Sequence, residues 1–122
     1  MTRERLDLGR LGEGQALERL KKEGYRIVAR NYRNRCGEID IIARDGKTLC
    51  FVEVRTRTKT WHGHPFESIS PAKQRKIIRT AQGYLTQQNT EDVEARFDVV
   101  AVTPQENGNY TVEIIKNAFE VD

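Results

Sequence analysis

The sequence predicts an α/β fold, a mixed β-sheet flanked by helices, with its elements in the order αβββαββ. Two segments carry apolar residues at helical spacing, and Asp45-Gly46 lies between two β-rich segments, which is a strong signal for a hairpin. Residues 97–102 (FDVVAV) are almost all apolar, as is typical of a central strand buried on both faces. The length of 122 residues fits one domain, which we place at residues 1–122 with its core over about residues 8–119.

The first helix is predicted over residues 8–23. Its apolar stripe runs through Ala16 and Leu20, and Gly24 is a natural stop signal. Residues 25–32 are rich in β-branched and aromatic side chains, which favours a strand directly after this helix.

The remaining elements follow from turn and cap signals. Residues 37–44 and 47–57 are expected to be the two strands of the hairpin. Ser70-Pro71 has the form of an N-cap followed by proline at the first helical position, so a second helix is expected to begin there. Residues 110–115 alternate between apolar and polar side chains and are expected to form a final edge strand.

Charge is unevenly distributed along the chain, although the formal net charge is only +3. Residues 55–79 carry a net charge of +6 and residues 80–122 a net charge of −6. Such a basic segment indicates a surface that binds a polyanion, and its plainer interpretation is a solvated face. No stretch reaches the roughly 18 apolar residues of a membrane span, and the N-terminus lacks the apolar region of a signal peptide. With only two cysteines, these features predict a cytoplasmic protein with reduced thiols.

The hairpin carries acidic residues on one of its faces. With Asp45-Gly46 as the two-residue turn, Glu38 lies opposite Glu53, and Asp40 is a diagonal neighbour of Glu53. Like charges placed opposite each other destabilise a sheet, and a bound cation removes that penalty. Oxygen ligands of this type suit Mg²⁺ or Mn²⁺, so the hairpin predicts a metal site.

Glu13 on the first helix is a second unusual carboxylate. It precedes Ala16, Leu17 and Leu20 by three, four and seven residues and therefore lies on the apolar stripe. A carboxylate in that position is costly unless it is paired or binds a ligand. The alternative is that Glu13 lies at the frayed start of the helix and interacts with the positive end of the helix dipole.

Together these residues resemble a known pattern. A carboxylate on the first helix, an Asp on one strand and a following strand that ends in Glu-x-Lys characterise the PD-(D/E)xK nucleases, whose fold is restriction-endonuclease-like. The short order of elements is similar to that of archaeal Holliday-junction resolvases. More closely, the chain resembles the bacterial YraN family, an endonuclease-like family, over about residues 8–119. The segments that carry this resemblance are LGEGQALERL, NYRNRCGEIDIIARD, LCFVEVRTR, SPAKQRKI, RFDVVAV and IIKNAF.

The resemblance implies roles for five residues. Glu13, Asp40 and Glu53 would be catalytic carboxylates that bind Mg²⁺ or Mn²⁺. Arg55 stands where the nuclease pattern has lysine, and arginine cannot act as a base because it does not deprotonate in proteins. It can still bind a phosphate oxygen and stabilise developing charge. Lys73 shares a helical face with the apolar residues of the second helix, so we expect it to point toward the site and to replace part of the missing lysine's function.

Nucleic acid, most of all DNA, is the partner that the basic segment and the resemblance imply. The resemblance to resolvases, which act as dimers, also implies a homodimer and a branched or single-stranded substrate. Asp98 opens a buried strand and is expected to be structural. The residues expected to contact nucleic acid are Arg33, Arg57, Lys59, Trp61, Lys76 and Arg79.

Three functions remain open at this point. The first is a divalent-metal-dependent endonuclease that hydrolyses phosphodiester bonds. The second is a nucleic-acid-binding module on a nuclease fold without catalysis, which the arginine at position 55 favours. The third is an assembly protein, for which the small overall charge and the acidic last third of the chain leave room.

Overall fold

The computed structural model describes residues 3–57, 69–90 and 92–120 and contains two helices and five strands within them. The order αβββαββ confirms the predicted α/β architecture, which is that of a restriction-endonuclease-like fold. Neither of the described helices is long and apolar enough to cross a membrane. The bounds are α1 (Arg3–Lys22), β1 (Arg26–Asn34), β2 (Gly37–Asp45), β3 (Thr48–Thr56), α2 (Pro71–Gln87), β4 (Ala95–Pro104) and β5 (Tyr110–Phe119).

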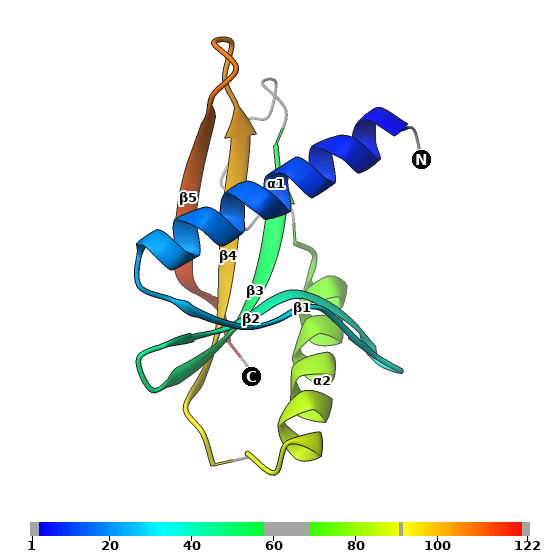
Figure 1. Ribbon diagram of the computed structural model, residues 1–122. Coiled ribbons are helices and arrows are strands. Elements are labelled where there is room, and N and C mark those ends of the chain that lie inside the picture. The colour runs from blue at the N-terminus through cyan, green and yellow to red at the C-terminus, as the bar shows by residue number, and fades with distance from the viewer. Residues whose placement is uncertain (1–2, 58–68, 91, 121–122) are drawn as a thin grey trace.

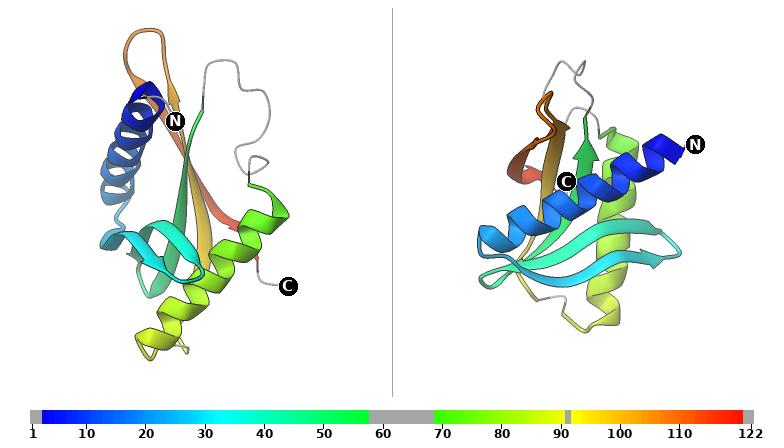
Figure 2. Two further views of the ribbon diagram at one scale, coloured as in Figure 1. Left: turned by 90° about the vertical axis from the view of Figure 1, so that its right-hand side faces the viewer. Right: turned by 45° about the horizontal axis from the view of Figure 1, so that its top comes forward.

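All five strands belong to one sheet in the order β1-β2-β3-β4-β5 (Figure 1). The β3–β4 pair is parallel and the other three pairs are antiparallel, so the sheet is mixed. A parallel pair needs a crossover connection, and α2 lies in that connection. The two helices lie on opposite sides of the sheet (Figure 2). As expected, β5 is an edge strand.

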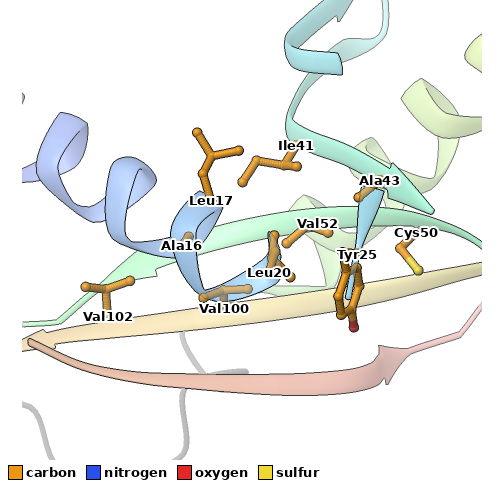
Figure 3. Packing of buried hydrophobic residues seen from close by; sticks show 10 residues of the cluster. All are labelled: Ala16, Leu17, Leu20, Tyr25, Ile41, Ala43, Cys50, Val52, Val100 and Val102. Carbon is orange, nitrogen blue, oxygen red and sulfur yellow. The ribbon is translucent and has the colours of Figure 1, made fainter. Parts of the chain in front are cut away.

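The face covered by α1 has its own hydrophobic cluster. Ala16, Leu17 and Leu20 of α1 are buried against Val52 of β3 and Val100 of β4 (Figure 3). The helix ends at Lys22, and Gly24 shortly after it has a φ of 93°, a left-handed conformation that favours glycine. The apolar stripe predicted from the sequence is therefore the face by which α1 packs on the sheet.

The face covered by α2 is more aromatic. Phe97 stacks on Phe119 with ring centroids 5.0 Å apart and lies 5.7 Å from Phe51. Ser70 caps α2, because its hydroxyl accepts a hydrogen bond of 3.1 Å from the backbone N–H of Lys73. The cap fixes where the first turn of α2 begins and so fixes the position of Lys73.

The hairpin forms at the predicted place but in a different register. Asp45 pairs with Thr48, so the two-residue loop is Gly46-Lys47 and not Asp45-Gly46. Gly46 has a φ of 63°, and a two-residue turn with glycine at its first central position is the type II′ geometry. β2 therefore ends one residue later than predicted and β3 begins one residue later, whereas the paired residues still share the same faces.

β2 separates from β3 beyond the Ile41–Val52 pair. Pairing of β1 with β2 continues to Gly37, but pairing of β2 with β3 ends at Ile41. The β1–β2 ribbon curves away across α2, while β3 continues alongside β4 (Figure 1). Ile39 consequently packs in the cluster on the α2 side, although Ile41, two residues later, packs on the α1 side. This separation opens the sheet beside Asp40 and Glu53.

Candidate functional site

Asp40 lies at the point where β2 leaves β3. Its carboxylate accepts a hydrogen bond of 2.8 Å from the backbone N–H of Val54, which bridges the two strands after the regular ladder has ended. The pKa of Asp40 is raised, mainly because its burial penalises the charged form, and the hydrogen bond from Val54 and the charge of Lys73 oppose that effect. Asp40 is thus held in place on β2 and directed toward β3.

Glu53 on β3 is more deeply buried, with 6% of its surface exposed. Lys73 Nζ lies 3.5 Å from Glu53 Oε1, and Arg55 Nε lies 3.8 Å from the same oxygen. Burial, and after it the charge of Asp40, raises the pKa of Glu53 to about 7 against the lowering effect of the two cations. Glu53 and Asp40 are therefore neighbouring carboxylates whose charged forms repel each other.

Glu13 approaches the same place from α1. Its pKa is raised, first by burial and then by the charge of Asp40, while Arg30 lowers it. Gly12 allows α1 to lie close to β3, because a Cβ at that position would collide with the Thr56 side chain. Asp40 is thus the common neighbour of a carboxylate from α1 and a carboxylate from β3.

Glu38 is positioned differently from the sequence-based expectation. We predicted that Glu38 lies opposite Glu53. This prediction is wrong, because the hairpin loop lies one residue further along the chain. Glu38 instead pairs across the β1–β2 ladder with Arg33, whose Nε lies 3.3 Å from Glu38 Oε2. Its negative charge still lies near Asp40 and contributes to the raised pKa of that residue.

The residues at this site fit a hard divalent cation in their chemistry. Asp40 and Glu53 offer carboxylate oxygens, the ligands that Mg²⁺ and Mn²⁺ prefer. No group of three or more His, Cys, Asp or Glu side chains within the described residues is arranged to enclose a metal ion. A cation here would therefore be held by a small carboxylate set completed by water, as is usual for Mg²⁺.

The predicted nucleic-acid contacts are distributed over several places. Arg33 and Lys76 line a hollow between the β1–β2 turn and α2. Arg57 Nε donates a hydrogen bond of 3.1 Å to the Thr103 hydroxyl, which holds its side chain against the end of β4. Arg79 is exposed on α2 outside the lining of this hollow. Lys59 and Trp61 lie outside the described residues.

Asp98, which the sequence predicts to be structural, lies in a polar network that was not predicted from the sequence. Arg96 donates to both carboxylate oxygens of Asp98, at 2.8 and 3.0 Å, and the Tyr25 hydroxyl donates to Asp98 at 3.0 Å. Arg96 also bonds to Asp45 at 2.7 Å, and Lys116 reaches Asp45 at 3.2 Å. The available signal was the Arg-x-Asp spacing on one strand, which places both side chains on one face.

Comparison with known proteins identifies the family. The family model described as "Uncharacterised protein family UPF0102" matches residues 12–102. A UPF0102 protein of Prosthecochloris aestuarii is 51% identical over 118 residues, covering 93% of each chain. UPF0102 proteins of Desulfosudis oleivorans and Desulforapulum autotrophicum are 50% and 47% identical, respectively, over all 122 residues, which make up 97% and 100% of those proteins. The chain therefore belongs to the UPF0102 family, also called the YraN family.

Proposed function

We propose that this protein is a divalent-cation-dependent endonuclease that hydrolyses phosphodiester bonds in nucleic acid. The observation that carries the proposal is the proximity of the Asp40 and Glu53 carboxylates where β2 separates from β3, with Lys73 3.5 Å from Glu53. Two carboxylates with raised pKa values, beside two cationic side chains, combine ligands for a metal with groups that can bind phosphate.

Asp40 and Glu53 would hold Mg²⁺ or Mn²⁺, with Glu13 as a third carboxylate near Asp40. When bound, such a cation supplies charge neutralisation and a more acidic water. Arg55 would bind a non-bridging phosphate oxygen and stabilise the charge that develops on it, since a guanidinium cannot take up a proton. Lys73 is close enough to Glu53 to contact the same phosphate and would supply part of what the missing lysine does.

The wider proposal follows from charge and family resemblance. The partner is DNA, with a branched or single-stranded substrate by analogy with the resolvases. The protein works in the cytoplasm and acts as a homodimer, since two symmetric cuts need two sites. The basic residues Arg33, Arg57, Lys76 and Arg79 would contact phosphates, and so would Lys59 from the segment after β3, with Trp61 stacking on a base.

A cleavage assay tests this proposal. The protein is incubated with labelled single-stranded, duplex, flap and four-way-junction DNA in Mg²⁺, Mn²⁺ or EDTA. Asp40→Asn keeps an acceptor for the Val54 N–H but removes the charge, and Asp92→Asn is a matched control on the exposed surface. We expect cleavage that requires metal, is unchanged in Asp92→Asn and falls at least about 100-fold in Asp40→Asn. Metal-independent cleavage, or equal rates in both variants, would contradict the proposal.

The second candidate is a nucleic-acid-binding module without catalysis. It is favoured by Arg55 in the position of the nuclease lysine and by the two cations that already contact Glu53. In the same assay this candidate predicts salt-dependent binding of DNA with no cleavage in any metal.

A further inference from the structure

A basic hollow lies next to the carboxylate site, between the turn that joins β1 to β2 and the first half of α2. We call it the turn groove. It has a volume of about 550 Å³, within the range of sites that enclose a ligand. One wall is formed by Arg33, Arg35 and Cys36, and the facing wall by Lys73, Lys76 and Ile77.

The walls of the turn groove are held together by hydrogen bonds. The Asn34 side-chain amide donates to the backbone carbonyl of Thr80 at 3.0 Å, and its oxygen accepts from the Cys36 N–H at 2.8 Å. Gly37 lies so close to α2 that a Cβ there would be 2.8 Å from the Thr80 hydroxyl. The turn is thereby fixed against the helix, so the groove exists before any ligand binds and needs little ordering.

The charge of the groove favours an anion. Four of its lining residues are basic, and one, Glu38, is acidic, which leaves a net charge of +3. Glu38 already contacts Arg33 at 3.3 Å, while Arg35, Lys73 and Lys76 extend the positive charge onto both walls. A phosphate lying in the groove would therefore meet cations from two sides.

Lys73 connects the groove to the carboxylate site. It lines the groove, and its ammonium nitrogen also lies 3.5 Å from Glu53. A nucleic-acid backbone in the groove would therefore pass Lys73 and come close to Asp40 and Glu53. The groove and the carboxylate site are separated by no more than the length of the Lys73 side chain.

We propose that the turn groove binds the sugar–phosphate backbone of a single DNA strand, so that the protein selects single-stranded segments over duplex. This inference rests on the proposed function, because it names the substrate that enters the carboxylate site. A single strand can bend into the groove and present its phosphates to both walls. A paired strand is fixed to its partner and can reach only the rim. A basic groove that follows the backbone is one of the features by which proteins bind single strands.

Binding measured in EDTA tests the inference without any hydrolysis. Fluorescence anisotropy is recorded with a labelled single strand of roughly 12 nucleotides and with the same strand in a duplex, at several salt concentrations. Lys76→Gln and Arg35→Gln change the groove. Lys22→Gln is the matched control, because Lys22 is also an exposed helical lysine but lies on α1, away from the groove.

We expect the wild type to bind the single strand at least about 10-fold more tightly than the duplex. Lys76→Gln and Arg35→Gln should each weaken single-strand binding about 3- to 10-fold and lower the salt slope by about 0.7, the value for one phosphate contact on a single strand. Lys22→Gln should match the wild type. Equal binding of duplex and single strand, or equal effects of Lys76→Gln and Lys22→Gln, would overturn the inference.

The two proposals fail in distinguishable ways. Groove-dependent binding of a single strand with no metal-dependent cleavage would reject the nuclease and retain the groove. Metal-dependent cleavage that Lys76→Gln and Arg35→Gln leave unchanged on single-stranded substrates would reject the groove and retain the nuclease. Circular dichroism of each variant confirms that the fold is intact before either result is interpreted.

Discussion

Asp98 on β4 and Glu53 on β3 lie almost side by side in the sheet, and their environments differ. In the β3–β4 ladder Asp98 pairs with Val52 and Glu53 pairs with the next residue, Val99. Asp98 is fully buried and accepts hydrogen bonds from Arg96, Tyr25 and the backbone N–H of Asn117, all between 2.8 and 3.0 Å. Glu53 contacts Lys73 and Arg55 at the longer distances of 3.5 and 3.8 Å and lies near the like charge of Asp40.

The difference separates a structural carboxylate, Asp98, from Glu53, the carboxylate to which we assign a function in our proposal. A buried charge is tolerated when its lone pairs are filled by well-aligned donors, as they are around Asp98. The pKa of Glu53 is instead raised to about 7, which means that the folded protein disfavours its charged form. A sheet that keeps two such carboxylates together gives up stability there, and the cation site that we propose would explain why.

Removing the charge at Asp98 should give the largest effect on stability. Asp98→Ala leaves the Arg96 guanidinium and the Tyr25 hydroxyl without their buried acceptor. We expect a loss of about 3–5 kcal/mol in the free energy of unfolding, measured by urea denaturation in EDTA. Glu53→Gln under the same conditions should lose far less or gain stability. A loss in Glu53→Gln as large as that in Asp98→Ala would remove the distinction between the two carboxylates.

The hairpin register shows where sequence reasoning was limited. Asp45-Gly46 predicts the position of the turn, but the side chain of Asp45 bonds to Arg96 and Lys116, which keeps Asp45 in the strand. The turn therefore moves to Gly46-Lys47. The partners of Asp45 are 51 and 71 residues away in the chain, so no local pattern could indicate them.

The residues of the candidate site could be predicted from the sequence, but their arrangement in space could not. Alternation along the strands placed Asp40 and Glu53 on one face, and the helical spacing of α2 placed Lys73 near them. The separation of β2 from β3 beyond Ile41 was not predictable, because alternating side chains look the same in a straight strand and in a strongly curved one. That curvature forms the turn groove and directs Glu38 toward Arg33.

The pH dependence of stability should distinguish Glu53 from Asp98 further, with an effect somewhat smaller than that of Asp98→Ala. The pKa of Glu53 in the folded protein is about 7, above its ordinary value of 4.5, so the folded state holds this proton more tightly than the unfolded state. Stability should therefore fall as the pH rises from about 4.5 to about 7, by roughly 2–3 kcal/mol from this group. Glu53→Gln should remove that part of the pH dependence in EDTA.

Asp45, at the hairpin end of β2, should make the free energy of unfolding depend on pH with the opposite sign. Hydrogen bonds from Arg96 and Lys116 lower the pKa of Asp45 in the folded protein, so its contribution is present above the unfolded pKa and is lost as the pH falls below it. Urea denaturation of the wild type and Glu53→Gln from pH 3 to pH 8 separates the two effects. A parallel pH dependence of the two proteins between pH 4.5 and 7 would show that Glu53 is not held in a destabilised charged state.

We propose that Asp40 and Glu53 are kept together to bind a cation, at the expense of stability. Thermal unfolding of the wild type and of Asp40→Asn, each in EDTA and in Mn²⁺, tests this most directly. In EDTA the variant should melt at or above the temperature of the wild type, because one of two repelling charges is gone while the acceptor for the Val54 N–H remains. Mn²⁺ at about 100 times its dissociation constant should raise the wild-type midpoint by roughly 10 °C and leave the variant unchanged. A variant that melts well below the wild type in EDTA, with neither protein responding to Mn²⁺, would show that Asp40 is a structural residue like Asp98.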